Sequence, residues 1–272
     1  MKQFTLKKIT IVFGVVVLIL LAFGTIYASA QGDSEAIDTI RTFIGNPSLE
    51  LRAVPDTDTV HGLQIRTYST LDGTSTFSVD IQRQQVVVAI LANTQSSEAS
   101  GINHDQALQI AQTFASARIS EFQRMSLVKD TSEDHGSAGQ QYCFLWAELL
   151  GTQQAIGPKR VAITVDTNSG AILSFMQIHS ESITVGVEPT ISRDQALAIA
   201  QKQFGAPTIS QSVTLDVWWH NNDRTQPQVL RWTVILDSNV PLDANAVASQ
   251  FIYKHAVYTI DAHTGDLIEE LN

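Results

Sequence analysis

The residues best suited to metal chemistry lie near the C-terminus, where the chain places His255, Asp261 and His263 close together in sequence. Two imidazoles and one carboxylate are a donor set that can hold zinc. Asp261, however, belongs to a turn that the chain repeats, and its counterparts Asp80 and Asp166 have no matching histidines. We therefore expect surface histidines beside a hairpin, and we predict neither a metal site nor a cofactor.

Signatures of enzymatic catalysis are missing from the sequence. It contains no H-E-x-x-H, no G-x-G-x-x-G and no P-loop. Residues 135–139, H-G-S-A-G, approach the G-x-S-x-G motif but lack its first glycine and lie in a polar stretch. The single cysteine, Cys143, lies in an apolar strand-like run, which excludes an intramolecular disulfide and favours a buried, inert thiol. The sequence therefore predicts no catalytic residues.

The most unusual local pattern is Trp218-Trp219-His220. Neighbours in a strand face opposite sides, so we expect one tryptophan to enter the core and the other to face outward. An exposed tryptophan is a suitable anchor for a partner, because aromatic residues dominate binding hot spots. A second core layer, or packing against a neighbouring segment, explains the pair about as well. We name these three residues as candidate partner contacts and keep both interpretations open.

The elements that would position such residues are repeated along the chain. Residues 102–112, I-N-H-D-Q-A-L-Q-I-A-Q, and residues 191–201, I-S-R-D-Q-A-L-A-I-A-Q, are identical at eight of eleven positions. Each copy begins with an N-cap residue, and a glutamine three positions later completes a capping box. These pairs are Asn103 with Gln106, and Ser192 with Gln195. Both stretches therefore predict the start of a capped helix that faces a core.

A second pair of phrases closes the two copies: A-I-T-V-D-T-N-S-G-A-I-L from residue 162 and V-Y-T-I-D-A-H-T-G-D-L-I from residue 257. Each contains a turn that begins with an aspartate, Asp166 or Asp261, and ends with a glycine, Gly170 or Gly265. The aspartate can accept bonds from turn amides, and glycine tolerates the positive φ of a tight hairpin. We predict that these four residues are structural.

The pattern predicts an α+β protein built of tandem small modules. Each module is expected to have one helix packed on an antiparallel sheet of about four strands. Residues 34–92 show the same order of one helix and short strands, and we interpret them as a diverged first copy. The expected segments are an N-terminal transmembrane helix at 1–30 and modules at 34–92, 101–179 and 190–272.

The helix phrase D-Q-A-L-x-I-A, followed by strands that close on (I/V)-D-x-x-(T/S)-G-x-(I/L), resembles the PepSY domain. That module occurs in propeptides of thermolysin-like metallopeptidases and in membrane-anchored bacterial surface proteins. The resemblance is clear over 101–179 and 190–272 and faint over 34–92. It implies a small helix on an antiparallel sheet, no catalytic residues, and a role in binding or restraining a peptidase or other hydrolase. We expect such a partner to be a separate chain.

The N-terminal residues indicate a membrane segment. Lys7 and Lys8 precede an apolar run at residues 9–27, and about nineteen helical residues nearly span a bilayer core. The lysines place this end in the cytoplasm and the body outside it. Residues 28–30, A-S-A, match a signal-peptidase site. Two interpretations stay open: a retained single-pass anchor in the cell membrane, favoured by the length of the run, or a protein secreted after cleavage at Ala30.

The charge of the chain limits the classes of partner that it can bind. The net charge is −10, and because residues 1–30 hold three lysines and no acid, the remainder carries −13. An acidic body argues against nucleic acid and against peripheral binding to anionic lipid. We expect a non-enzymatic, membrane-anchored, extracytoplasmic binding module that modulates or inhibits a peptidase or cell-wall hydrolase. The alternatives are a sensory or structural ectodomain that binds a small ligand or wall polymer, and a hydrolase with an unrecognised site.

Overall fold

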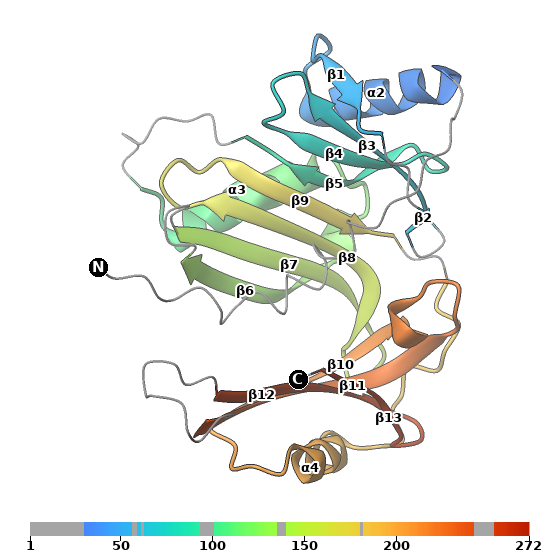
Figure 1. Cartoon of the computed structure of the whole chain (residues 1–272), viewed down its shortest axis with the longest axis vertical. Coiled ribbons are helices and arrows are strands. Elements are labelled where there is room, and N and C mark those ends of the chain that lie inside the picture. The colour runs from blue at the N-terminus through green and yellow to red at the C-terminus, as the bar shows by residue number, and fades with distance from the viewer. Residues whose placement is uncertain are drawn as a thin grey trace. The chain divides into compact units, whose positions relative to one another are not determined.

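The computed structural model of the chain is shown in Figure 1. It describes residues 30–55, 59–60, 63–92, 101–134, 140–179, 182–241 and 253–271. These residues fall into two compact units, one within Met1–Ala92 and one within Asn93–Asn272. The transmembrane helix expected at 1–30 lies outside the described residues apart from Ala30. No helix in the described part of the chain is long and apolar enough to cross a membrane.

The first unit is a helix on an antiparallel meander. Its elements are α2 (Ala30–Ile44), β1 (Leu51–Ala53), β2 (Thr59–Val60), β3 (Leu63–Thr70), β4 (Thr76–Asp80) and β5 (Gln85–Ile90). Strand β3 pairs with β1, β2 and β4, and β4 pairs with β5. The buried Ala36 and Ile40 lie one helical turn apart on α2, and they share the core with Tyr68, Phe77 and Val79.

The second unit contains both clear copies of the repeat. The first copy consists of α3 (His104–Ser116), η2 (Phe122–Arg124), β6 (Ser126–Asp134), β7 (Gln140–Leu150), β8 (Ala155–Asp166) and β9 (Ile172–Ile178). The second consists of α4 (Arg193–Phe204), β10 (Ser210–Trp219), η4 (His220–Asn222), β11 (Gln228–Pro241), β12 (Tyr253–Asp261) and β13 (Leu267–Leu271). Within each copy, successive strands pair antiparallel.

The expectation of tandem small modules, each with a sheet of its own, is wrong for these copies. Strand β8 is 12 residues long, and near its start Ile156 pairs in parallel with Asp216 of β10. One mixed sheet therefore runs through both copies, as β8 and β10 show in Figure 1. The buried Ala155 of β8 also belongs to the core that α4 covers. The copies merge because β8 continues beyond its own module and shares a core with the next one.

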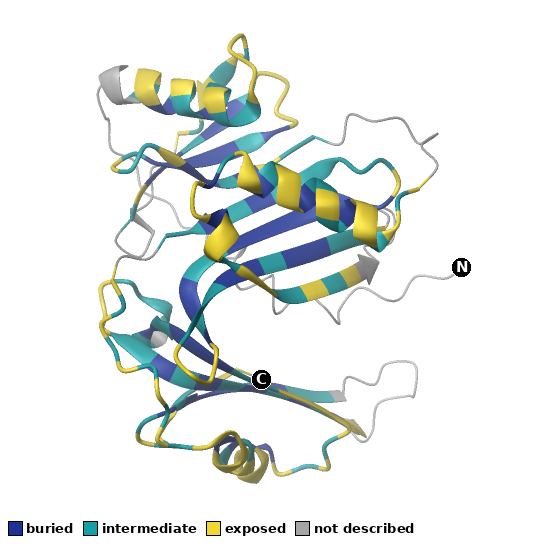
Figure 2. Cartoon of the chain, turned by 180° about the vertical axis from the view of Figure 1, so that it is seen from behind, coloured by how far each residue is buried: buried dark blue, intermediate teal, exposed yellow. Residues whose placement is uncertain are grey.

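Each helix covers one face of its own strands and leaves its outer face exposed, as Figure 2 shows for α3 and α4. The buried residues recur every fourth position, which is the spacing of one helical face. They are Ala107, Ala111 and Ala115 on α3, and Ala196, Ala200 and Phe204 on α4. Small alanines allow the helices to approach the sheet closely, so the two repeated phrases produce similar packing.

Both helices begin with a capping box. The Asn103 side chain accepts from the Gln106 amide at 2.9 Å, and the Gln106 side chain accepts from the Asn103 amide at 2.9 Å. The corresponding distances for Ser192 and Gln195 are 3.2 and 2.8 Å. These bonds satisfy amides that would otherwise have no partner within the helix. The polar residues of the repeated phrase therefore cap the N-terminus of each helix.

The closing turn of each copy holds the start of its helix. Asp166 accepts from the Ser169 amide at 2.8 Å, and Asp261 accepts from the His263 amide at 2.7 Å. Gly170 and Gly265 have φ of 74° and 84°, which side chains rarely adopt. A Cβ on Gly170 would lie only 3.1 Å from a methyl of Ile110 on α3. The two phrases recur together because they pack against each other.

Candidate functional site

The two adjacent tryptophans of β10 differ in burial, and their rings contact each other edge-on with centroids 5.2 Å apart. Trp219 is buried, two residues after Val217 and four after Leu215, which belong to the core beneath α4. Trp218 is partly exposed. His220 begins the short helix η4, and its amide donates to the carbonyl of residue 227 at 3.0 Å. Of the two tryptophans among the three candidate contacts, Trp218 is therefore the more exposed.

A buried carboxylate lies on the same face as Trp218. Asp216 Oδ2 accepts from Arg160 Nη2 at 2.8 Å, and Asp216 Oδ1 accepts from Arg231 Nε at 3.0 Å. The Thr233 hydroxyl lies 3.4 Å from the same Oδ1. Burial by itself raises the pKa of Asp216, but the charges of Arg231 and Arg160 outweigh it and hold this pKa below its usual value. Asp216 is therefore ionised at neutral pH.

The two arginines also contact the ring of Trp218. The guanidinium carbon of Arg160 lies 4.4 Å from the ring centroid, and that of Arg231 lies 5.8 Å from it. Both distances are within the range of cation–π attraction. We call Arg160, Asp216, Trp218 and Arg231 the Trp218 cluster. Its members come from β8, β10 and β11, so it lies where the strands of the two copies meet.

Sequence reasoning found Trp218 and missed the rest of the cluster. The available signal was local: Asp216 is two residues before Trp218 in an otherwise apolar stretch, so both face the same side of a strand. Arg160 and Arg231 are 56 and 15 residues away from Asp216. Their approach depends on the pairing of β10 with β8 and β11, which no local pattern predicts.

The residues that we considered for zinc form hydrogen bonds with different groups. His255 Nδ1 lies 2.7 Å from Asp237 Oδ1 on the neighbouring strand, while the Asp261 carboxylate accepts from the turn amides of His263 and Thr264. Among the residues that the structure describes, no three side chains of His, Cys, Asp or Glu gather as a metal group. The arrangement offers the pair of His255 and Asp237, but among the described residues no third donor joins it.

His104 at the start of α3 forms a further polar contact. Its Nε2 lies 2.9 Å from Asp130 Oδ2 on β6, and its ring packs edge-on against Tyr142 and Phe144. The bond to Asp130 raises the pKa of His104 above its usual value, against a smaller opposing effect of desolvation. Arg193 holds the equivalent position on α4. The repeated phrase thus places His104 in one copy and Arg193 in the other at the same helix position.

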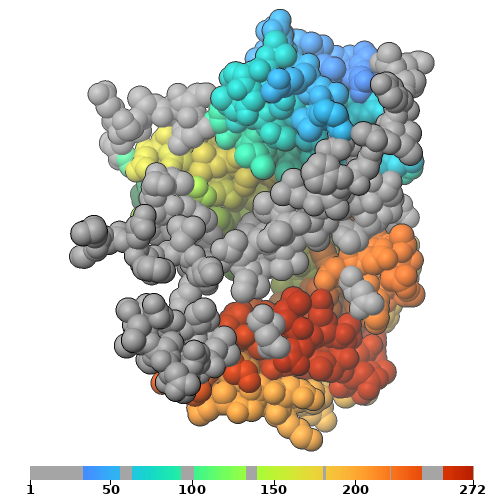
Figure 3. All heavy atoms as spheres, viewed as in Figure 1, coloured from blue at the N-terminus to red at the C-terminus, as the bar shows by residue number. Residues whose placement is uncertain are grey.

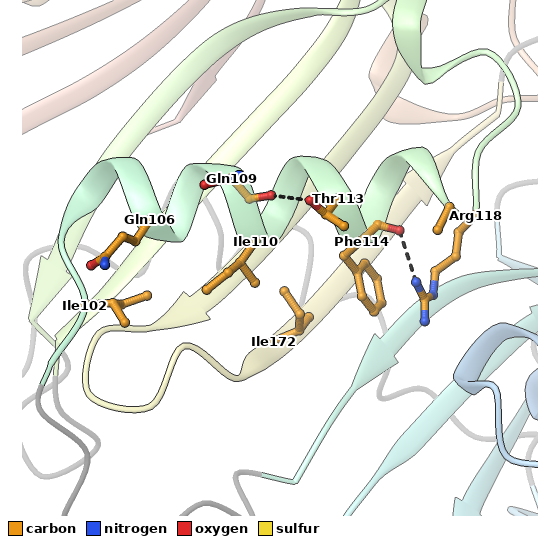
Figure 4. Close-up of a pocket in the computed structure, with 9 residues that line it drawn as sticks. Ile102, Gln106, Gln109, Ile110, Thr113, Phe114, Arg118 and Ile172 are labelled. Atoms are coloured by element: carbon orange, nitrogen blue, oxygen red, sulfur yellow. Dashed lines mark hydrogen bonds between the residues drawn. The ribbon is translucent and has the colours of Figure 1, made fainter.

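A shallow groove runs along α3, with a volume of about 640 Å³. Figure 4 shows Ile110 and Phe114 of α3, Ile102 just before it and Ile172 of β9 directed into the same space. The guanidinium of Arg118 lies 3.7 Å from the Phe114 ring centroid at one end. The rest of the described lining is apolar or amide, apart from the Thr113 hydroxyl, which donates to the Gln109 carbonyl at 2.8 Å. Its side chains therefore suit packing more than chemistry.

Comparison with known proteins identifies no family. No protein-family model matches the chain, and no curated protein matches its sequence. Among solved structures, the Bacillus megaterium YpeB C-terminal domain is similar with a TM-score of 0.46 and 12% identity, over 91% of this chain and 98% of that one. An uncharacterized protein from Eubacterium rectale ATCC 33656 has a TM-score of 0.47 and 8% identity, over 89% of this chain and 82% of that one. Structural similarity at this level is no evidence of function. The PepSY resemblance therefore rests on the repeated sequence phrases alone.

Proposed function

We propose that this protein is a non-enzymatic binding module that docks a separate protein outside the cytoplasm. Residues 9–27 would hold it at the membrane. The expected partner is a peptidase or cell-wall hydrolase, the class that the PepSY resemblance implies. Docking would add a partner strand to an exposed sheet edge, a recognised mode of protein association. The sequence phrases support the partner class, and the geometry of one strand supports the docking mode.

The observation that carries the proposal is the edge strand β13. In the described part of the chain it pairs with β12 and with no other strand. Leu267 and Leu271 are 39% and 37% exposed. Figure 3 shows the segment of β12 and β13, in red, at the surface. An unpaired edge presents a row of backbone donors and acceptors, and exposed apolar side chains on it favour the addition of another strand.

The charge of β13 restricts the strand that it would accept. Glu269 and Glu270 lie between the two leucines. Glu270 accepts from the Tyr258 hydroxyl at 3.3 Å, and Glu269 accepts from the Asn222 side chain at 3.4 Å. Opposite charges across paired strands are favourable and like charges are unfavourable. We therefore expect a partner strand that carries basic residues between apolar ones.

Crosslinking of the full chain in cells, followed by identification of the captured protein, tests this function. The edge is altered by Leu267→Lys with Leu271→Lys, which places charge on the docking strand. The matched control is Ile209→Lys, because Ile209 is 64% exposed and precedes β10. We expect capture of one hydrolase-class protein, reduced more than about tenfold by the edge variant and unchanged by the control. Equal capture by both variants, or no captured protein, would contradict the proposal.

A further inference from the structure

Strand β6 lies at an edge of the sheet in the second unit. In the described part of the chain it pairs with β7 and with no other strand, whereas its counterpart β10 pairs with both β11 and β8. Each of these strands is the first of its copy. An edge strand has backbone hydrogen bonds on one side only, so it opens more readily than a strand with two neighbours. A side-chain contact that fastens β6 therefore affects how often this edge opens.

The contact between His104 and Asp130 fastens β6 to the helix of the same copy. His104 is the first residue of α3, and its Nε2 lies 2.9 Å from Asp130 Oδ2 on β6. This Nε2 is buried, although each side chain as a whole is 38% exposed. The two atoms are within ion-pair distance but lack the alignment of a hydrogen bond. The strength of the contact therefore depends mainly on the charges of the two groups.

Two aromatic rings hold the imidazole of His104 in this position. It packs edge-on against Tyr142 and Phe144, with ring centroids 5.4 and 5.5 Å away. Both rings come from β7, and Phe144 lies opposite Asp130 in the pairing of β6 with β7. Turning the imidazole toward water would cost these ring contacts. It therefore stays directed at Asp130.

The charges around His104 make the contact sensitive to pH. The charged groups that face it are Asp130 from β6 and Asp105 from α3, whose carboxylate lies 3.4 Å from Nδ1, and Tyr142 is the titratable group on β7 that packs on the ring. The N-terminus of a helix disfavours a cation. Even so, the pKa of His104 is raised, with Asp130 as the main cause. A raised pKa means that the contact favours the protonated imidazole and weakens as the proton is lost.

The second copy has no histidine at this position. Arg193 begins α4 and lies 3.8 Å from Asp194 of the same helix. Arginine keeps its charge throughout the physiological pH range. Strand β10 also has a paired neighbour on each side. The titratable residue thus occurs in the copy whose first strand is an edge.

We propose that His104 and Asp130 form a pH-dependent clasp, which holds the β6 edge closed in mildly acidic surroundings and lets it open more often as the pH rises. Histidine changes its charge between about pH 5 and pH 8. Below this range the imidazolium attracts the Asp130 carboxylate. Above it the ionic attraction is gone, and β6 is held by its backbone pairing with β7. Neither residue belongs to β13, so the clasp does not depend on the docking edge.

Amide hydrogen exchange of the full chain in detergent, measured by mass spectrometry between about pH 5.5 and pH 8.5, tests the clasp. The quantity compared is the protection of β6 relative to β8, after correction for the intrinsic pH dependence of exchange. We expect the relative protection of β6 to fall about two- to fivefold over this range, which is the effect of a half-exposed ion pair. The imidazole NMR signals of His104 should titrate with a midpoint above the ordinary histidine value.

Three variants identify the groups responsible. His104→Gln keeps a polar side chain that cannot be protonated, and it should abolish the pH dependence of β6 protection. Asp130→Asn should abolish it as well and should lower the His104 midpoint. His135→Gln, which changes the next histidine after β6 in sequence, is the matched control and should leave the dependence in place. A dependence that persists in His104→Gln, a dependence that is lost in His135→Gln, or an unchanged His104 midpoint in Asp130→Asn would overturn the proposal.

Discussion

Asp216 brings a negative charge into a strand whose neighbouring residues, Leu215 and Val217, are buried in an apolar core. Its carboxylate joins three strands, because Arg231 reaches it from β11 and Arg160 reaches it from β8. One of these arginines belongs to the other copy of the repeat. A single side chain thus links the copies electrostatically at the point where their strands pair.

Loss of this carboxylate should be costly. We expect Asp216→Asn to lower the free energy of unfolding by about 3–5 kcal/mol at pH 7, because it leaves two largely buried guanidinium groups without a counter-charge. Urea unfolding of both proteins measures the difference. The control is Glu121→Gln, which removes a more exposed partner of Arg124 and Lys159 and should cost less than about 1 kcal/mol. Equal costs for the two variants would contradict the linking role.

The stabilisation that Asp216 provides should also depend on pH. The pKa of Asp216 is lower in the folded state than its usual value, so its ionisation stabilises the folded protein above the unfolded-state pKa. That contribution is lost as the pH falls through the folded-state pKa. The difference between wild type and Asp216→Asn should therefore stay constant from pH 7 to about pH 5 and shrink in acid below about pH 4.

At the scale of single residues, sequence reasoning reached what depends on local alternation. The rule that neighbours in a strand face opposite sides predicts one buried and one exposed tryptophan. Trp219 is buried and Trp218 is partly exposed, but their rings contact each other, so they do not lie on fully opposite sides. The same rule puts Asp216 beside Trp218. It cannot supply Arg160 or Arg231, because their contacts depend on which distant strands pair and in which register.

The helices and hairpin turns were predictable because their signals are local. A capping box needs two residues three positions apart, and the closing turn needs an aspartate before a glycine. The structure shows both in each copy, with Gly170 close to Ile110 and Gly265 close to Ile191. The extent of β8 was not predictable. Nothing in its sequence marks the residues that pair with β10 in addition to β7.

The cap of α4 gives a prediction at this scale. We expect Ser192→Ala to lower the free energy of unfolding by about 1 kcal/mol, because the Gln195 amide loses its acceptor. Ser192→Asp keeps an oxygen at the same place and should stay within about 0.5 kcal/mol of wild type. Urea unfolding midpoints report both changes. An alanine variant as stable as the aspartate variant would show that the capping bond does not contribute.

At the scale of the whole second unit, the repeat has become one structure. A parallel contact between Ile156 and Asp216 joins two antiparallel sheets, and the core under α4 includes Leu150 and Ala155 from the preceding copy. The Thr152 amide and hydroxyl also donate to Glu188 of the connecting segment, at 2.9 and 2.8 Å. The repeated phrases indicate how many copies the chain has. They do not predict the contacts between copies, because residues outside the phrases form those contacts.

This joint predicts that the strands of both copies unfold together. Phe144 on β7 is fully buried in the first copy, and Phe144→Ala should cost about 3–5 kcal/mol through lost packing and a residual cavity. If residues 93–272 unfold as one cooperative unit, this loss of stability should accelerate amide exchange in β11 and β12 by the corresponding factor. Neither strand pairs with the strand segment around position 144. Phe77→Ala, in the other unit, is the matched control and should leave β11 and β12 unchanged. Exchange that accelerates only in β6–β9 would mean that the two copies unfold independently, because the contact between β8 and β10 would then be too weak to couple them.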